Sequence, residues 1–288
     1  MGKTLQKIHM KELIKLCRPE QYYKNLVIFL HILFSQQITN VALLGKTIEG
    51  FIILCLVSSI NYIINDLKDK EKDKLHPEKI HRPLASGTVS TTQAIFLIGI
   101  LTIITIVMMT QFTIEFNLWI GALFFLTQAY TFIIKKIPYA DVLIIASNFV
   151  IRTLAGVFIN GQPEIHISPW LILCPFFLAM FLASGKRLAE MHYKEHRETL
   201  KEYTQESIQR LHTIAATLLI MTYSLYIILA QRTIFLITLP CAIYTIFRYT
   251  AQLEEKRKSN TLTIMRDKPL ILGAVLWFIL IIVLLYII

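Results

Sequence analysis

Charged residues are scarce in this 288-residue chain, in which Asp, Glu, Lys and Arg together make up 17% of the sequence. Soluble domains usually contain about 25% charged residues. Hydrophobic residues make up 55% of the chain, and they gather in apolar runs of roughly 20 residues, the length that crosses a hydrocarbon core of about 30 Å. This composition excludes a disordered or collagen-like chain and argues against a soluble protein. We expect an all-α, polytopic membrane protein.

Cysteine is also sparse, since only Cys17, Cys55, Cys174 and Cys241 are present and they lie far apart. There is no CxxC motif and no Cys/His cluster, so we expect neither a disulfide framework nor a thiolate metal site. The first 20 residues are basic and amphipathic and lack a long apolar core followed by small residues. A removable signal peptide is therefore not expected.

Hydropathy predicts nine membrane-spanning helices. The first is the weakest, because Gln36, Gln37 and Thr39 shorten its apolar core. The predicted ranges are 24–40, 43–64, 91–110, 113–134, 139–159, 168–186, 211–230, 232–250 and 270–288.

Positive charge is distributed unevenly between the connections. The net charge is +10, and all but three of the 29 Lys and Arg residues lie before the first span or in alternate connections. The exceptions are Lys46, Arg152 and Arg232. Because cytoplasmic loops are enriched in Lys and Arg, we expect a cytoplasmic amino terminus and an external carboxyl terminus. The excess of positive charge is thus explained without nucleic-acid binding.

An acidic cluster follows the second span. Asp66, Asp69 and Asp73 are three and four residues apart, so on a continuing helix they face one side together with Asn65. Mg²⁺ prefers hard oxygen ligands and commonly joins one or two carboxylates to the phosphates of a substrate. The alternative is a solvated charged loop, but the interleaved lysines fall on other faces of the helix. We therefore expect the three aspartates to be catalytic Mg²⁺ ligands.

A basic loop comes next, with the sequence HPEKIHRPLASG at 76–87. Lys79 and Arg82 can bind phosphate oxygens, and arginine does so with a two-pronged fork. Pro83 and Gly87 predict a turn before the third span begins near Ser90. Such a loop on its own is usually a topology determinant, but directly after the acidic cluster a phosphate-binding role is favoured.

The pairing of NDLKDKEKD with HPEKIHRPLASG resembles the UbiA superfamily of intramembrane prenyltransferases. Within it, the chain is most similar to the branch that attaches phosphoribose to a polyprenyl phosphate. The resemblance implies nine helices around a central cavity, one domain over 1–288, and cytoplasmic active-site loops at 65–90 and 185–210. It also implies a bacterial cytoplasmic membrane. Further matching stretches are RPEQYYKN at 18–25, Tyr130 to Lys135, 141–156, 168–170, 184–190 and 266–277.

The fifth span carries Asp141, Asn148 and Arg152 in one stripe, seven and four residues apart. An arginine deep in a span is a functional candidate by default. One reading is an internal ion pair that holds the helices together, and the other is a cavity wall that binds a substrate anion. The resemblance adds Tyr130 and Lys135 as substrate-binding candidates.

After the sixth span, this sequence departs from the UbiA pattern. Other members place a second Asp-rich cluster there, whereas this chain has SGKRLAE, which is mainly basic. Lys186, Glu190 and Lys194 share one helical face. We expect Lys186, Arg187 and Glu190 to bind an anion rather than a second metal. Lys24, where the first span meets the headgroups, is either a lipid-phosphate ligand or a snorkelling interfacial lysine.

Together these features predict transfer of 5-phosphoribose from phosphoribosyl diphosphate to a polyprenyl (decaprenyl-type) phosphate, with Mg²⁺ and with release of pyrophosphate. The alternative is a prenyltransferase that moves an isoprenoid from its diphosphate to an aromatic or other small acceptor. A transporter or lipid-binding scaffold would leave the acidic cluster without a purpose. The lipid bilayer is the expected environment, and a homo-oligomer is left open.

Overall fold

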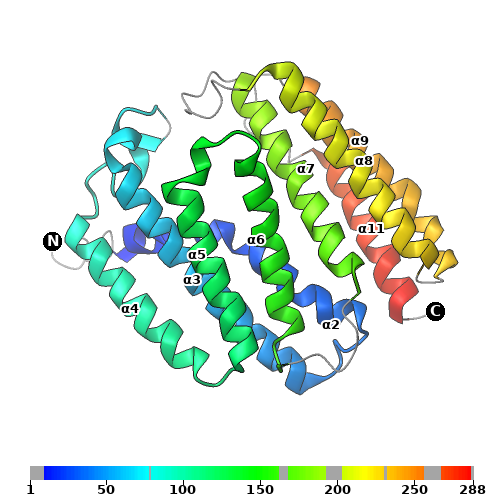
Figure 1. The fold of residues 1–288 in the computed structure, drawn as a ribbon, viewed down its shortest axis with the longest axis horizontal. Coiled ribbons are helices and arrows are strands. Elements are labelled where there is room, and N and C mark those ends of the chain that lie inside the picture. Colours follow the sequence, from blue (N-terminus) through cyan, green and yellow to red (C-terminus); the bar gives the residue numbers. More distant parts are fainter. Residues whose placement is uncertain are drawn as a thin grey trace. The chain divides into compact units, whose positions relative to one another are not determined.

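The structure is a computed structural model that describes residues 10–77, 79–161, 168–192, 203–229, 232–255 and 267–286. Within these ranges every regular element is a helix, which confirms the predicted all-α class (Figure 1). The described residues form two compact units. The first contains the residues before 34, 37–131 and 151–161, and the second contains 34–36, 132–150 and the residues from 168 onward.

The first unit is built around α3 (Val41–Lys74), a helix of 34 residues. Its start is fixed by the side chain of Asn40, which accepts a hydrogen bond from the Leu43 amide. The helix α4 (Thr91–Met109) begins at a capping box made by Ser90 and Gln93. The remaining long elements of this unit are α5 (Ile114–Phe132) and the last turns of α6 (Ala140–Val157).

The predicted first span, 24–40, is not a single α-helix. A 3₁₀ stretch, η1 (Pro19–Phe29), is followed by the five-residue α2 (Leu30–Phe34). The chain then turns at Gln36, whose φ angle is +60°. The polar pair Gln36–Gln37 ends the apolar run, and the Gln36 side chain donates to the Leu285 carbonyl at 2.6 Å. This segment therefore cannot be counted as an α-helical span.

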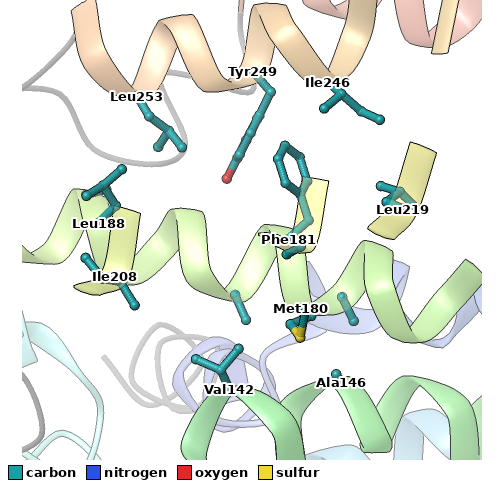
Figure 2. Packing of buried hydrophobic residues seen from close by; sticks show 14 of the residues in the cluster. Val142, Ala146, Met180, Phe181, Leu188, Ile208, Leu219, Ile246, Tyr249 and Leu253 are labelled. Carbon is teal, nitrogen blue, oxygen red and sulfur yellow. The ribbon is translucent and has the colours of Figure 1, made fainter. Parts of the chain in front are cut away.

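The second unit contains η3 (Ile134–Lys136), the first turns of α6, α7 (Trp170–His192), α8 (Gln205–Leu229), η5 (Thr233–Thr238), α9 (Leu239–Glu255) and α11 (Lys268–Tyr286). Helices α7 and α8 lie side by side (Figure 1). In the core of the unit, Phe181 of α7 lies against Tyr249 of α9, with 5.1 Å between the ring centroids (Figure 2). Gly185 allows this approach, because a Cβ atom there would lie 2.9 Å from the Tyr249 ring.

Seven of the described helices are long and apolar enough to cross a membrane, so the predicted count of nine is not confirmed. The helix α5 is not among the seven, although it matches the predicted span 113–134. Large apolar side chains such as Phe96 and Ile103 are exposed on α4, as expected for a surface that faces lipid rather than water. The predicted loops are partly helical, since α3 includes 65–74 and α7 includes 185–192. The single-domain assignment remains an expectation.

One close approach holds the end of α6 in the first unit. A Cβ atom on Gly156 would lie 2.1 Å from the carbonyl oxygen of Ile28. No side chain larger than hydrogen fits there without a shift of backbone, so Gly156 sets how closely α6 and η1 pack.

Replacing Gly156 with alanine is therefore expected to destabilise the protein by about 1–3 kcal/mol through overpacking. The thermal unfolding midpoint of the detergent-purified protein measures this. Gly121→Ala is the matched control, since a Cβ at Gly121 meets nothing within 4 Å and alanine is the better helix former. Equal midpoints for the two variants would show that the contact is unimportant.

Candidate active site

Two buried carboxylates and two arginines form a cluster at the end of α3, which we call the Asp66 cluster (Arg18, Asp66, Asp73 and Arg82). Arg82 donates from Nη1 to Asp73 at 2.7 Å and to Asp66 at 3.2 Å. Arg18 also donates to Asp66 through Nη2. The aspartates are only 2% and 5% exposed. One guanidinium group thus holds two carboxylates that lie two helical turns apart on α3.

The segment after α3 folds so that it carries Arg82 back to these carboxylates. The short η2 (Lys79–His81) leads into Arg82, and the Ser86 amide donates to the Arg82 carbonyl at 2.8 Å. Leu84 is buried against Ile63 of α3. Gly87, with φ +77°, completes the turn before Ser90. The predicted continuation of the helix and the predicted turn at Pro83–Gly87 are both confirmed.

Arg18 was missed as a site residue in the sequence. It has a left-handed backbone conformation, φ 53° and ψ 57°, which is uncommon for a residue other than glycine. Its guanidinium donates to Asp66 and also lies 5.2 Å from the centre of the Tyr62 ring. The one available signal was its place at the head of the RPEQYYKN stretch.

The oxygen atoms of the Asp66 cluster can be compared with the ligands that Mg²⁺ prefers. Among the described residues, no group of three or more His, Cys, Asp or Glu side chains is arranged to hold a metal. Asp66 and Asp73 nevertheless bring carboxylate oxygens to one cation, Arg82, and Mg²⁺ often uses only one or two carboxylates together with substrate phosphates. The pair therefore fits Mg²⁺, while the participation of the part-exposed Asp69 remains a prediction.

Other predicted residues of the first unit lie on neighbouring elements. Asn65 precedes Asp66 on α3, Lys79 opens η2, and Tyr130 is near the end of α5. Lys24 lies on η1, with its ammonium 5.9 Å from the centre of the Tyr23 ring. All four are partly exposed, so their side chains are accessible.

A second polar group in the first unit surrounds Arg152. Its Nε donates to Asn25 Oδ1 at 2.8 Å, and both residues are buried. Asn25 donates in turn to Cys55 Sγ at 3.3 Å, while Ser58 donates to Asn25 at 3.4 Å. The three residues of the predicted α6 stripe, Asp141, Asn148 and Arg152, are all buried, and Asp141 belongs to the second unit.

In the second unit, charged residues form what we call the Arg187 cluster (Asp141, Arg187, Glu190 and Tyr203). Arg187 donates from Nε to Asp141 at 2.8 Å and from Nη1 to Glu190 at 2.6 Å. Arg187 is only 2% exposed, whereas the side chain of Lys186 is 58% exposed and lies 3.8 Å from Glu190. Arg187 is thus held in internal ion pairs with Asp141 and Glu190. Lys186 is the more accessible cation. Lys194 lies outside the described residues.

Tyr203, also missed in the sequence, completes the Arg187 cluster. Its hydroxyl donates to Asp141 at 2.9 Å and accepts a hydrogen bond from the Tyr139 amide. Burial raises the pKa of the Tyr203 phenol above its ordinary value, so the neutral, donating form persists. The predicted residue Lys135 lies on η3 of the same unit and is partly exposed.

Comparison with known proteins gives one family. The chain matches the UbiA prenyltransferase family over residues 28–266. It is 32% identical over 238 residues to the decaprenyl-phosphate phosphoribosyltransferase of Mycolicibacterium smegmatis, covering 79% of this chain and 73% of the relative. The Corynebacterium glutamicum protein of the same name is 31% identical over 223 residues, covering 74% and 66%.

Solved structures share the fold. A UbiA homologue from Archaeoglobus fulgidus bound to DMAPP and Mg²⁺ has a TM-score of 0.74 at 17% identity, covering 96% of this chain and 100% of that chain. The same homologue bound to GPP has a TM-score of 0.74 at 18% identity, covering 95% and 99%. At these identities the likeness concerns the fold.

Replacing Arg187 with glutamine leaves Asp141 and Glu190 buried without their cation. We expect a loss of about 3–5 kcal/mol in unfolding free energy, as is usual when one partner of a buried ion pair is removed. Thermal or denaturant unfolding in detergent measures the loss. Arg210→Gln is the control, because Arg210 and Glu206 form an exposed pair worth about 0–1 kcal/mol. A similarly small effect at both sites would contradict the structural role of Arg187.

Proposed function

Because the chain belongs to the UbiA prenyltransferase family, we propose that this multi-pass membrane transferase moves 5-phosphoribose from phosphoribosyl diphosphate to a polyprenyl (decaprenyl-type) phosphate, with release of pyrophosphate. The observation that carries the proposal is the Asp66 cluster, in which two carboxylates and two arginines meet at one point. Relatives of about 30% identity are named for this reaction. Their names support the proposal.

The Asp66 cluster is proposed as the diphosphate end of the donor site. Asp66 and Asp73, with Asp69 as a further candidate, would hold Mg²⁺, and the bound ion would supply positive charge to the diphosphate. Arg82 would exchange carboxylate oxygens for diphosphate oxygens when the donor binds. Lys79 lies on the adjoining η2 and would add a second cation, so that negative charge developing on the leaving group is stabilised electrostatically.

The acceptor needs little activation in this proposal. A phosphate monoester is already ionised at neutral pH, so no general base is required for its attack. A phosphate oxygen forms the new bond to the anomeric carbon, and the bond from that carbon to the diphosphate oxygen breaks, with the electron pair leaving on pyrophosphate. Direct displacement inverts the configuration at the anomeric carbon. Lys24, which belongs to the same unit as the Asp66 cluster, is the accessible candidate for holding the lipid phosphate. In the second unit, Lys186 stays a predicted anion-binding residue.

The proposal also includes the orientation of the chain. The predicted cytoplasmic amino terminus places the 65–90 segment on the cytoplasmic side, where a water-soluble sugar diphosphate is available. The cytoplasmic membrane of a bacterium is the proposed location, as the resemblance implied.

Prenyl transfer to an aromatic or other small acceptor is the second candidate. It is favoured by the fold likeness to a homologue whose structures hold DMAPP or GPP. Both reactions would use the carboxylates of α3, and they differ in the group attached to the diphosphate.

The test supplies detergent-purified protein with the substrates of both candidate reactions. One reaction contains polyprenyl phosphate, Mg²⁺ and labelled phosphoribosyl diphosphate, and a parallel reaction contains prenyl diphosphate and aromatic acids. Label that moves into the organic phase, and fails to do so with EDTA, supports phosphoribosyl transfer. Prenylation of an aromatic acid, with the sugar label left in water, would show that the second candidate is correct.

The carboxylate assignment predicts that Asp73→Asn lowers turnover by at least about 10²-fold, since it weakens a proposed ligand of the Mg²⁺ that would stabilise the developing negative charge. The unfolding midpoint should fall less than in Arg187→Gln, because Arg82 keeps Asp66 as a partner and is 27% exposed. Glu71→Gln is the matched control, because Glu71 lies on the same turn of α3, is exposed and pairs only locally with Lys74 among its described ion pairs. It should keep near-wild-type turnover. Normal activity in Asp73→Asn would remove the residue from the metal site.

A further inference from the structure

A row of polar side chains continues along α3 from Asp66 toward the middle of the helix. Tyr62, Ser58 and Cys55 precede Asp66 at spacings of four, four and three residues, so they share its face. With a rise of 1.5 Å per residue, Tyr62 is about 6 Å and Ser58 about 12 Å along the axis from Asp66.

Two other elements of the first unit bring polar groups to the same row. Asn25 of η1 is bonded to both Cys55 and Ser58, and Arg152 of α6 is bonded to Asn25. A buried cation in a membrane protein is costly and therefore marks a functional candidate. The bond from Arg152 Nε to Asn25 orients the planar guanidinium, whose paired Nη groups form the fork that suits a phosphate.

Tyr62 connects this polar group to the Asp66 cluster. Arg18 lies over the Tyr62 ring and also donates to Asp66. Tyr62 lies about one turn of α3 from Asp66 and one turn from Ser58, to which Asn25 is bonded. Asn25, which holds Arg152, meets α3 at Ser58 and Cys55. The polar group around Arg152 and the Asp66 cluster are therefore separated by two to three helical turns, roughly 12–17 Å along α3.

Two regions that each contain an arginine suit a donor with an anion at each end. In phosphoribosyl diphosphate, the diphosphate on C1 and the phosphate on C5 flank one five-membered ring. We propose that Arg152, oriented by Asn25, binds the 5-phosphate of the donor while the Asp66 cluster binds its diphosphate. This inference rests on the proposed function and names the part of the donor that the site selects. A prenyl diphosphate carries no second anion and gains nothing from Arg152.

The competing role for Arg152 is to hold η1 and α6 together, and the two roles differ in their donor dependence. The experiment measures kcat/KM for phosphoribosyl diphosphate and for ribose 1-diphosphate, which lacks the 5-phosphate. The wild-type protein should favour the phosphorylated donor by roughly 10–100-fold, the size expected for hydrogen bonds to a charged group. Arg152→Gln should lose activity with phosphoribosyl diphosphate alone, bringing the ratio close to one.

Two further variants sharpen the result. Arg82→Gln is the matched control, because it removes an arginine from the diphosphate end of the site. It should lower kcat/KM for both donors by the same factor and so leave the ratio of the two values unchanged. Arg152→Lys keeps the charge without the fork and should give an intermediate ratio, mainly through a higher KM for the phosphorylated donor. It also provides the measurement if Arg152→Gln fails to fold.

Equal losses with both donors in Arg152→Gln, or in Arg152→Lys, would overturn the inference and leave Arg152 a structural residue. A wild-type ratio close to one would overturn it as well, while phosphoribosyl transfer itself stands. A wild-type protein that uses neither sugar donor overturns the proposed function, and this inference with it.

Discussion

The pairing of buried charge is the constraint on which the rest of this structure depends. Few charged residues are present, and Asp66, Asp73, Asp141, Arg187 and Glu190, which are buried, are placed against opposite charge, since an ion removed from water is costly without a partner. Arg82 holds Asp66 and Asp73 together in the first unit, and Arg187 holds Asp141 and Glu190 in the second. Each arginine thereby fixes the side chains of two carboxylates that are distant along the sequence or along a helix.

The two clusters differ in what their surroundings allow. The side chain of Arg82 is 27% exposed, so an incoming anion can reach it and replace a carboxylate. Arg187 is almost completely enclosed, and Tyr203 closes the remaining side of Asp141. The first cluster is therefore suited to exchange partners with a ligand, whereas the second is suited to hold helices α6 and α7 of its unit in register.

The parts of the candidate site that depend on residues close together in the sequence could be predicted. The acids of the Asp66 cluster follow helical spacing, and the turn at Gly87 follows from residue types with strong backbone preferences. Arg18 and Tyr203 could not be found in that way, because their roles arise from contacts with residues more than 45 positions away. The break at Gln36 was signalled by polar residues, but hydropathy averages over such a short segment and cannot distinguish a 3₁₀ stretch from an α-helix.

The two faces of α3 have different roles. One face presents Asp66, Tyr62 and Ser58, while Ile53 and Val57 on the opposite face are buried in an apolar cluster of the first unit. Stability in this part of the chain is therefore supplied by the residues that the chemistry does not use. A change of donor preference can therefore act through Tyr62 and Ser58 of the polar face, while the carboxylates and the packed apolar face of α3 are kept.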